Sequence, residues 1–219
     1  LIYGNAGLGI DLGWNGVTAN DTGDGDTGPN NQQNFPVLTS VAYASSQFTI
    51  TGTLSSEANK TYRIEFFGIP YGSADASGNG EGNVFLGFVE VTTDASGNAS
   101  IGTTLAAAGL SYGAFVTATA TEKLGASSYG STSEFGANAQ AANTAPVLTV
   151  AASAAYTENA AAVALAPGAT AVDTELAAAG NYAGATLTLQ RNGGADAQDL
   201  FAATGGSLIF SGATGLEST

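Results

Sequence analysis

The sequence predicts an all-β protein, with two β-sandwiches in tandem behind a glycine-rich acidic segment. Three observations lead to this fold class. The composition is 44 % hydrophobic but only 10 % charged, with 31 glycines, and Val, Ile, Phe and Tyr alternate with Thr and Ser, as is typical of strands. Period-two alternation recurs in runs such as residues 47–54 and 61–66. Clusters of Asp, Asn, Ser and Gly separate these runs, which indicates turns.

Residues 1–35 form an extended segment that is rich in glycine and aspartate and has too few apolar side chains for a core of its own. Leu8, Ile10, Leu12 and Trp14 alternate along it. They suit a strand laid against a neighbour, which is either the sandwich that follows or another molecule. Trp14 is the only tryptophan of the chain. It is expected to pack against other side chains rather than to serve as a ligand platform.

Residues 36–136 are expected to form the first sandwich. The alternating runs predict seven strands, whose spacing is typical of an immunoglobulin-like sandwich. The predicted strands lie near residues 37–43, 47–54, 61–68, 84–92, 99–105, 113–121 and 132–136.

Residues 137–146 are small and polar and end in a proline, so they predict a linker to a second sandwich over residues 147–219. Strand candidates there are residues 147–150, 162–165, 185–190 and 207–210, and residues 174–179 suit a short turn of helix. These strands are fewer than a closed sandwich needs. Either the chain stops inside this domain, or a strand comes from elsewhere.

Composition also excludes several kinds of chemistry. The chain has no Cys and no His, which removes thiol nucleophiles, imidazole bases and metal sites built on thiolate or imidazole. Its formal net charge of −14 repels nucleic acids and anionic membrane surfaces. No apolar run is long enough to span a bilayer. We therefore expect no nucleic-acid partner and no membrane insertion.

The residues also resemble two families. Residues 8–38, followed by the runs YRIEFF, FLGFVEVTTDASGNAS and FVTATAT, are similar to the Ig-like domain that follows a parallel β-helix in bacterial surface proteins. The runs NTAPV, YTEN, APGA, VDTEL and NGGA between residues 143 and 195 resemble cadherin-like modules of large secreted repeat proteins and adhesins. The resemblance covers nearly the whole chain. It implies an extracellular or cell-surface location and a structural role.

The tract around Asp21, Asp24 and Asp26 is the sharpest chemical feature. Closely spaced carboxylates on a glycine-rich loop are the hard oxygen ligands that Ca²⁺ requires. The spacing matches neither an EF-hand nor a nonapeptide calcium repeat. The tract is therefore either a solvated acidic loop or a calcium site. The resemblance to cadherin-like modules implies a second calcium set, with Glu158 and Asp173 approaching one another at a domain end.

Three other patterns are weaker evidence for catalysis or ligand binding. Glu65 and Glu90 offer the two carboxylates of a glycosidase, but both lie in predicted strands, where they more often mark a solvent face. The glycines of residues 23–28 match a dinucleotide fingerprint only formally, since aspartates occupy the phosphate position. Tyrosines at five positions could line a sugar-binding strip, although packing is the favoured interpretation; they are Tyr43, Tyr62, Tyr71, Tyr112 and Tyr129.

Together these observations predict a non-catalytic structural module of an extracellular bacterial surface fibre or adhesin, stiffened by calcium. Its expected partners are other copies of itself, neighbouring modules of a longer chain, or surface glycans. In one version, the strand from Leu8 to Trp14 is donated to the incomplete second sandwich of the next copy, and the chain assembles head to tail. The alternative function is a carbohydrate-binding module of a secreted polysaccharide-acting protein.

Overall fold

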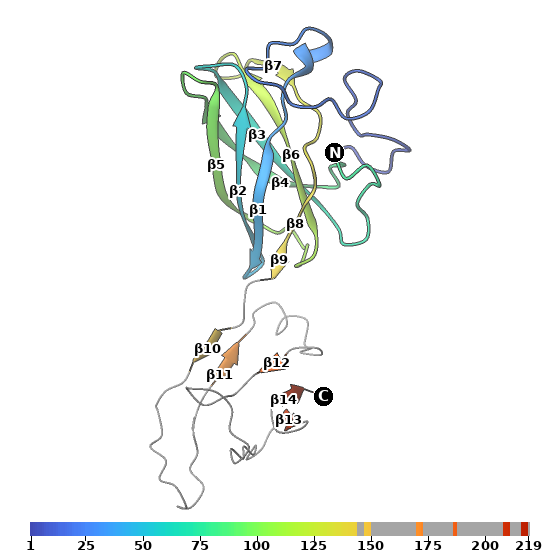
Figure 1. Ribbon diagram of the computed structural model, residues 1–219, viewed down its shortest axis with the longest axis vertical. Helices are drawn as coiled ribbons and strands as arrows, with labels where there is room; N and C mark the ends of the chain where they lie inside the picture. The colour runs from blue at the N-terminus through green and yellow to red at the C-terminus, as the bar shows by residue number, and fades with distance from the viewer. Residues whose placement is uncertain (144–146, 150–169, 173–185, 188–207, 211–215, 219) are drawn as a thin grey trace, which may run out of the picture. The chain divides into compact units, whose positions relative to one another are not determined.

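The structure is a computed structural model that describes residues 1–143, 147–149, 170–172, 186–187, 208–210 and 216–218 (Figure 1). The chain divides into two compact units, Leu1–Ala145 and Pro146–Thr219. Strands make up the regular structure of the described residues, which contain no α-helix and one short 3₁₀ helix, η1 (Pro29–Gln32). The predicted all-β class is confirmed.

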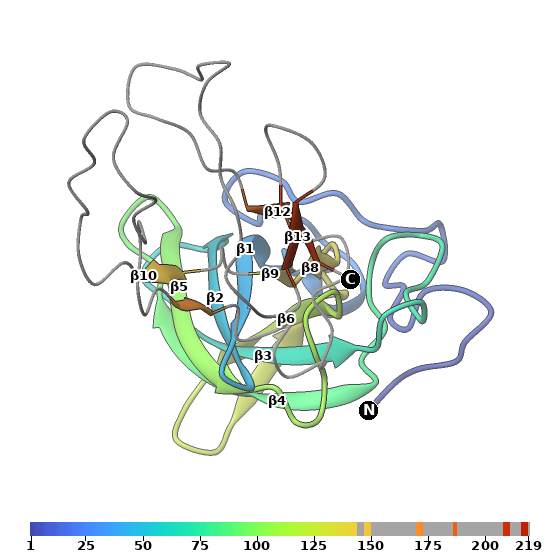
Figure 2. The same cartoon turned by 90° about the horizontal axis from the view of Figure 1, so that it is seen from below.

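The first unit contains two sheets, which form the two layers of a sandwich (Figure 2). One sheet has the order β5-β2-β1-β9, and the other has the order β4-β3-β6-β7, with β8 also paired to β6. All pairs are antiparallel except β1 with β9. The strands are β1 (Val37–Ala44), β2 (Gln47–Ser55), β3 (Thr61–Ile69), β4 (Val84–Thr92), β5 (Asn98–Ala106), β6 (Phe115–Lys123), β7 (Tyr129–Thr132), β8 (Ala139–Gln140) and β9 (Ala142–Asn143).

The core lies between the two sheets because successive side chains of each strand point to opposite faces. In β2 this alternation is complete: every second residue, from Phe48 to Leu54, is buried, and the residues between them are exposed. The largest fully buried side chains of the core cluster are Tyr62, Phe48, Phe66, Ile50, Leu54 and Ile64. Such burial is the main stabilising term of a sandwich.

Six of the seven strands predicted for residues 36–136 lie within two residues of observed strands at both ends. The seventh differs, because the structure has β7 (Tyr129–Thr132) where residues 132–136 were expected. Beyond Thr132 the chain still runs beside β6. Ser133 N donates to Ala120 O and Gly136 N donates to Ala118 O, each at 2.9 Å, without forming a continuous ladder.

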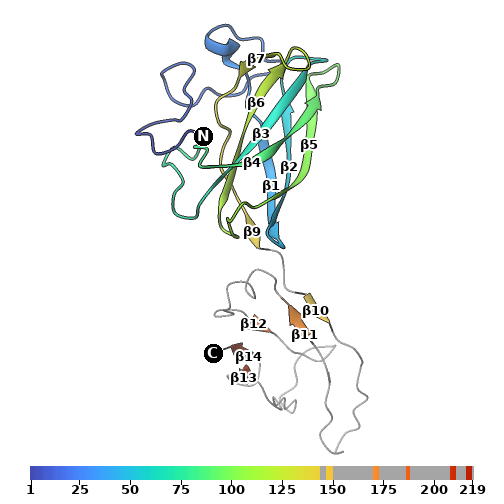
Figure 3. The ribbon, with the colours of Figure 1, turned by 180° about the vertical axis from the view of Figure 1, so that it is seen from behind.

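Residues 1–35, called the N-terminal segment below, fold back onto the sandwich of their own chain. Their beginning lies beside the loop between β3 and β4, and η1, near their end, lies beside β7 (Figures 1 and 3). Ile2 forms an isolated antiparallel bridge with Gly82 of that loop. Beneath them, Phe135 packs edge-on against Phe67, with 5.4 Å between ring centroids. A Cβ on Gly9 would meet the Phe135 ring at 3.1 Å, so the segment lies directly on this aromatic pair.

The range expected as a linker, residues 137–146, begins within the first unit, because residues 139–140 and 142–143 form β8 and β9. The second unit has two small sheets among its described residues, in the orders β10-β11 and β12-β14-β13. Its strands are β10 (Val147–Thr149), β11 (Thr170–Val172), β12 (Thr186–Leu187), β13 (Leu208–Phe210) and β14 (Leu216–Ser218). The predicted strand at 162–165 and the helical turn at 174–179 lie outside the described residues.

Candidate functional site

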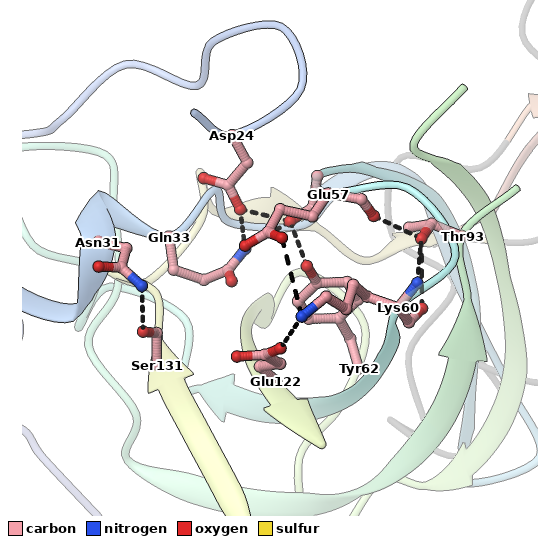
Figure 4. Close-up of polar contacts among 10 residues, drawn as sticks. Asp24, Asn31, Gln33, Glu57, Lys60, Tyr62, Thr93, Glu122 and Ser131 are labelled. Atoms are coloured by element: carbon pink, nitrogen blue, oxygen red, sulfur yellow. Dashed lines mark hydrogen bonds and ion pairs between the residues drawn. The ribbon is translucent and has the colours of Figure 1, made fainter. Parts of the chain in front are cut away.

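Asp24 lies at the centre of a buried polar cluster where the N-terminal segment meets the end of β2 (Figure 4). Its carboxylate accepts hydrogen bonds from the Gln33 side-chain amide, from the Ser56 hydroxyl and from Asn34 N at 3.0 Å. The Ser56 and Tyr62 hydroxyls are hydrogen-bonded at 2.7 Å. Asp24 is only 7 % exposed, and burial raises its pKa above the ordinary value of 3.8, while the bonds from Ser56 and Asn34 act in the opposite direction.

The side of this cluster toward β3 is held by contacts around the turn after β2 (Figure 4). Lys60 Nζ lies 2.7 Å from a Glu122 oxygen and 3.8 Å from a Glu57 oxygen. Thr93 Oγ1 donates to Glu57 O at 2.6 Å and accepts from Lys60 N at 3.0 Å. The turn is thus fixed by both charge and backbone hydrogen bonding.

These contacts bear directly on the three aspartates predicted to bind calcium. Asp24 directs both of its oxygens to protein donors, Asp21 is exposed, and Asp26 is half-buried. Within the described part of the chain, no three acidic, His or Cys side chains gather as a metal site. Glu158 and Asp173 lie outside the described residues. Calcium binding therefore stays a prediction, and the one role seen for Asp24 is to hold the N-terminal segment.

A second carboxylate, Glu134, fastens the middle of the N-terminal segment. Leu12 N donates to its Oε1 at 2.8 Å, and Thr18 N donates to its Oε2 at 2.9 Å. The Thr18 hydroxyl adds a third bond, to Oε1 at 3.1 Å. Glu134 is 2 % exposed. One buried glutamate therefore closes the base of the loop between Leu12 and Thr18.

A third carboxylate, Glu81, holds the beginning of the segment. It accepts hydrogen bonds from Gly4 N at 2.5 Å and from Asn5 N at 2.9 Å. Asp24, Glu81 and Glu134 are all buried, and all three accept backbone N–H groups. Charge-assisted hydrogen bonds of this kind are about twice as strong as neutral ones, so three such anchors bind the segment firmly to the sandwich.

The predicted assembly strand over residues 8–14 is not present as a strand, and this expectation is corrected. Leu8 and Ile10 are half-buried, Leu12 is buried and Trp14 is 92 % exposed, so the four residues do not share one face. The physical reason is that Leu12 N is drawn to Glu134, and the chain bends back at Asp11, whose carboxylate accepts bonds from later residues of the same loop. Leu8, Ile10 and Leu12 pack on their own sandwich, and Trp14 alone of the four stands in solvent.

Trp14 overturns a second expectation, since it does not pack against the protein. It lies in the loop of residues 11–18, called the Trp14 loop below. Asp11 braces this loop from within by accepting Asn15 N at 3.2 Å and Gly16 N at 3.1 Å. Trp14 itself has a φ of 55°, in the left-handed region that bulky residues rarely adopt. The indole of Trp14 is therefore exposed to solvent, on a loop whose backbone is fixed by hydrogen bonds.

The other candidate residues have structural partners. Glu65 pairs with Arg63 at 2.8 Å, and Glu90 pairs with Lys123 at 2.6 Å. The Arg63 guanidinium also lies over the Phe88 ring, 3.6 Å from its centroid. The five tyrosines do not share one environment. Tyr43 and Tyr62 are in the core, as the packing interpretation expected, whereas Tyr71, Tyr112 and Tyr129 are exposed.

The sequence analysis did not identify Glu81 and Glu134 as functional residues. Each is a lone glutamate in a run of small residues, and neither has a partner at a diagnostic spacing. Their roles arise only because the N-terminal segment returns to them from 77 and 122 residues away along the chain. No signal in one sequence marks such contacts.

None of the described residues belongs to a helix that is long and apolar enough to cross a membrane. No protein-family model matches the sequence, and comparison with curated proteins gives no match.

Proposed function

We propose that this chain is a non-catalytic structural module of an extracellular bacterial surface fibre or adhesin. The proposal rests mainly on one observation: three buried carboxylates bind the N-terminal segment to the sandwich of the first unit. A stretch that has no core of its own thereby becomes part of one compact unit. Such an arrangement suits a module that passes mechanical load from a preceding domain into a sandwich.

The strand order supports the proposed Ig-like class of the first unit. β1, β2 and β5 occupy the places of strands A, B and E of an immunoglobulin sheet, while β3, β6 and β7 occupy those of C, F and G. β4 lies beside β3 at the edge. The cadherin-like class of the second unit rests on the sequence resemblance.

The use of the charged residues supports a non-catalytic role. Lys60, Arg63 and Lys123 each form an ion pair with a glutamate. Glu65 pairs with Arg63 and Glu90 pairs with Lys123, so each of the two carboxylates already has a cationic partner within the sheet. The buried carboxylates are occupied by backbone donors. These groups serve the fold.

The proposed partners are other copies of the chain or neighbouring modules of a longer protein. Strand donation by residues 8–14 is not part of the proposal, because Leu12 is buried in its own unit and bound to Glu134. Calcium stiffening remains part of the proposal, on the acidic residues named from the sequence.

The proposal is tested on the producing cells. Antibodies raised against the chain should label intact cells, and brief protease treatment of intact cells should remove the label. Electron microscopy should place the label on surface material. Confinement of the protein to the cytosolic fraction would contradict the proposal, and so would turnover of a polysaccharide by the purified chain.

The alternative, a carbohydrate-binding module, is favoured by one observation, the exposed indole of Trp14. A sugar-binding strip of tyrosines gains no support, because Tyr43 and Tyr62 lie in the core. Binding to glycans without hydrolysis is also compatible with an adhesin.

A further inference from the structure

We propose that the Trp14 loop is a contact site for neutral carbohydrate, with the Trp14 indole as the stacking surface. This inference names a ligand class for the proposed adhesin, and it therefore rests on that proposed function. The site is the loop of residues 11–18, which projects from the N-terminal segment.

The first argument concerns exposure. Trp14 is 92 % exposed, the highest value among the exposed large hydrophobic residues of the described chain. Large aromatic rings dominate the energetics of cores and interfaces, and Trp is strongly enriched among residues that carry binding energy. Two residues earlier, Leu12 is only 7 % exposed. The loop therefore buries its leucine and leaves its tryptophan outside.

The second argument concerns the backbone. The Glu134 carboxylate accepts hydrogen bonds from Leu12 N and Thr18 N at the two ends of the loop. Within the loop, the Asp11 carboxylate accepts hydrogen bonds from Asn15 N and Gly16 N. Within this frame Trp14 takes a left-handed φ of 55°, a conformation that is unfavourable for an L-residue with a large side chain. A strained residue held by its surroundings, with no packing gained in return, is typical of a functional position. A preorganised loop also loses little conformational entropy when it binds.

The third argument concerns the ligand. Residues 1–35 contain no Lys or Arg, Asp11 lies in the loop, and the chain carries a net charge of −14, so anionic ligands are repelled. The residues next to Trp14 are Gly13, Asn15 and Gly16, which offer space and hydrogen-bonding groups, and the other exposed apolar residue of the loop is the smaller Val17. A protein partner needs a cluster of anchors over about 800 Å² on each side. One aromatic ring among polar groups instead suits a sugar ring, which has an apolar face and hydroxyls at its rim.

The test uses the full chain, in which Trp14 is the sole tryptophan and hence the sole indole fluorophore. Without ligand, its emission should be that of an indole in water and should be quenched strongly by acrylamide. Oligosaccharides of glucose, mannose, galactose and xylose are then added separately at millimolar concentration. With at least one of them, the emission should shift to the blue and acrylamide quenching should fall.

Variants assign the effect to the ring. In affinity electrophoresis with the polysaccharide of the responding sugar, Trp14→Ala should weaken retardation about tenfold, while Trp14→Tyr should keep part of it. Tyr71→Ala is the matched control, because Tyr71 is also exposed (75 %) but lies in the loop between β3 and β4. It should bind as the unmodified chain does. Because Trp14 contributes no packing, its variants should melt at the unmodified temperature.

Three results would overturn the proposal. They are an unchanged emission with every sugar, equal retardation of Trp14→Ala and the unmodified chain, and a blue shift that follows protein concentration without sugar. The last result would assign the ring to contact with a second copy. None of these results affects the outcome of the surface-labelling experiment. Failure of the sugar site can therefore be distinguished from failure of the structural role.

Discussion

Replacing Glu134 by Gln should loosen the N-terminal segment and destabilise the first unit. The glutamate receives three hydrogen bonds in a site where it is 2 % exposed. A glutamine keeps one acceptor oxygen. Its best orientation places that oxygen toward Leu12 N and the Thr18 hydroxyl and turns its own N–H group toward Thr18 N.

The cost follows from these contacts. A buried donor left without a partner costs about 1–3 kcal/mol, and each hydrogen bond that loses its charge weakens by about 1 kcal/mol. Since the two effects overlap, we expect Glu134→Gln to lower the free energy of unfolding by about 2–4 kcal/mol. Glu90→Gln is the matched control, because it removes an exposed glutamate that is paired with Lys123 in the sheet. Such pairs contribute about 1 kcal/mol or less.

Urea denaturation followed by circular dichroism measures both variants, and thermolysin digestion reports separately on residues 1–35. In Glu134→Gln the unfolding midpoint should fall, and cleavage within the N-terminal segment should quicken. In Glu90→Gln both should stay near the unmodified values. Equal midpoints and equal cleavage in the two variants would refute the anchoring role of Glu134.

Three further predictions concern other parts of the chain. Gly97→Ala should lower stability by about 2 kcal/mol or more, because Gly97 has a φ of +80° and an added Cβ would collide with backbone, whereas Gly102→Ala, which meets open space, should be neutral or slightly stabilising in the same thermal melts. Because burial raises the pKa of Asp24, ionising this carboxyl group costs more free energy in the folded state than in the unfolded state. The free energy of unfolding should therefore fall as the pH rises from the unfolded pKa of Asp24 through its folded pKa, while the ionised carboxylate keeps its hydrogen bonds from Gln33, Asn34 and Ser56. Urea denaturation of the unmodified chain and of Asp24→Asn from about pH 4 to about pH 7 checks this, and a difference that does not vary with pH would contradict it. Millimolar calcium should raise the melting temperature of the full chain over that in chelator, and Glu158→Gln combined with Asp173→Asn should reduce the rise; equal melting temperatures with and without calcium would contradict the calcium proposal.

The strands were predictable because their signal is local. In residues 47–54 the apolar and polar side chains alternate strictly, and one face of β2 is buried as the alternation requires. The last strand was misplaced because its pairing with β6 becomes irregular between Thr121 and Lys123. A shift of register between two strands leaves little trace in the sequence of one of them.

The candidate site was less predictable, because it depends on contacts far apart in sequence. Asp24 was singled out correctly as unusual, but the spacing of the aspartates suggested an ion, whereas its oxygens accept bonds from Gln33, Asn34 and Ser56. Trp14 was expected to pack because most tryptophans do. Its exposure follows from the closure of its loop by Glu134, which is 122 residues beyond Leu12.

Native-state hydrogen exchange of the full chain tests most directly whether the N-terminal segment is an integral part of the first unit. The amides of Leu12, Thr18 and Asn34, which are donated to buried carboxylates, should be protected to within about 1 kcal/mol of the Tyr62 and Thr119 amides in β3 and β6. Exchange of these three amides at the rate of an unstructured peptide, while β3 and β6 stay protected, would show that the segment is not anchored and would contradict the account.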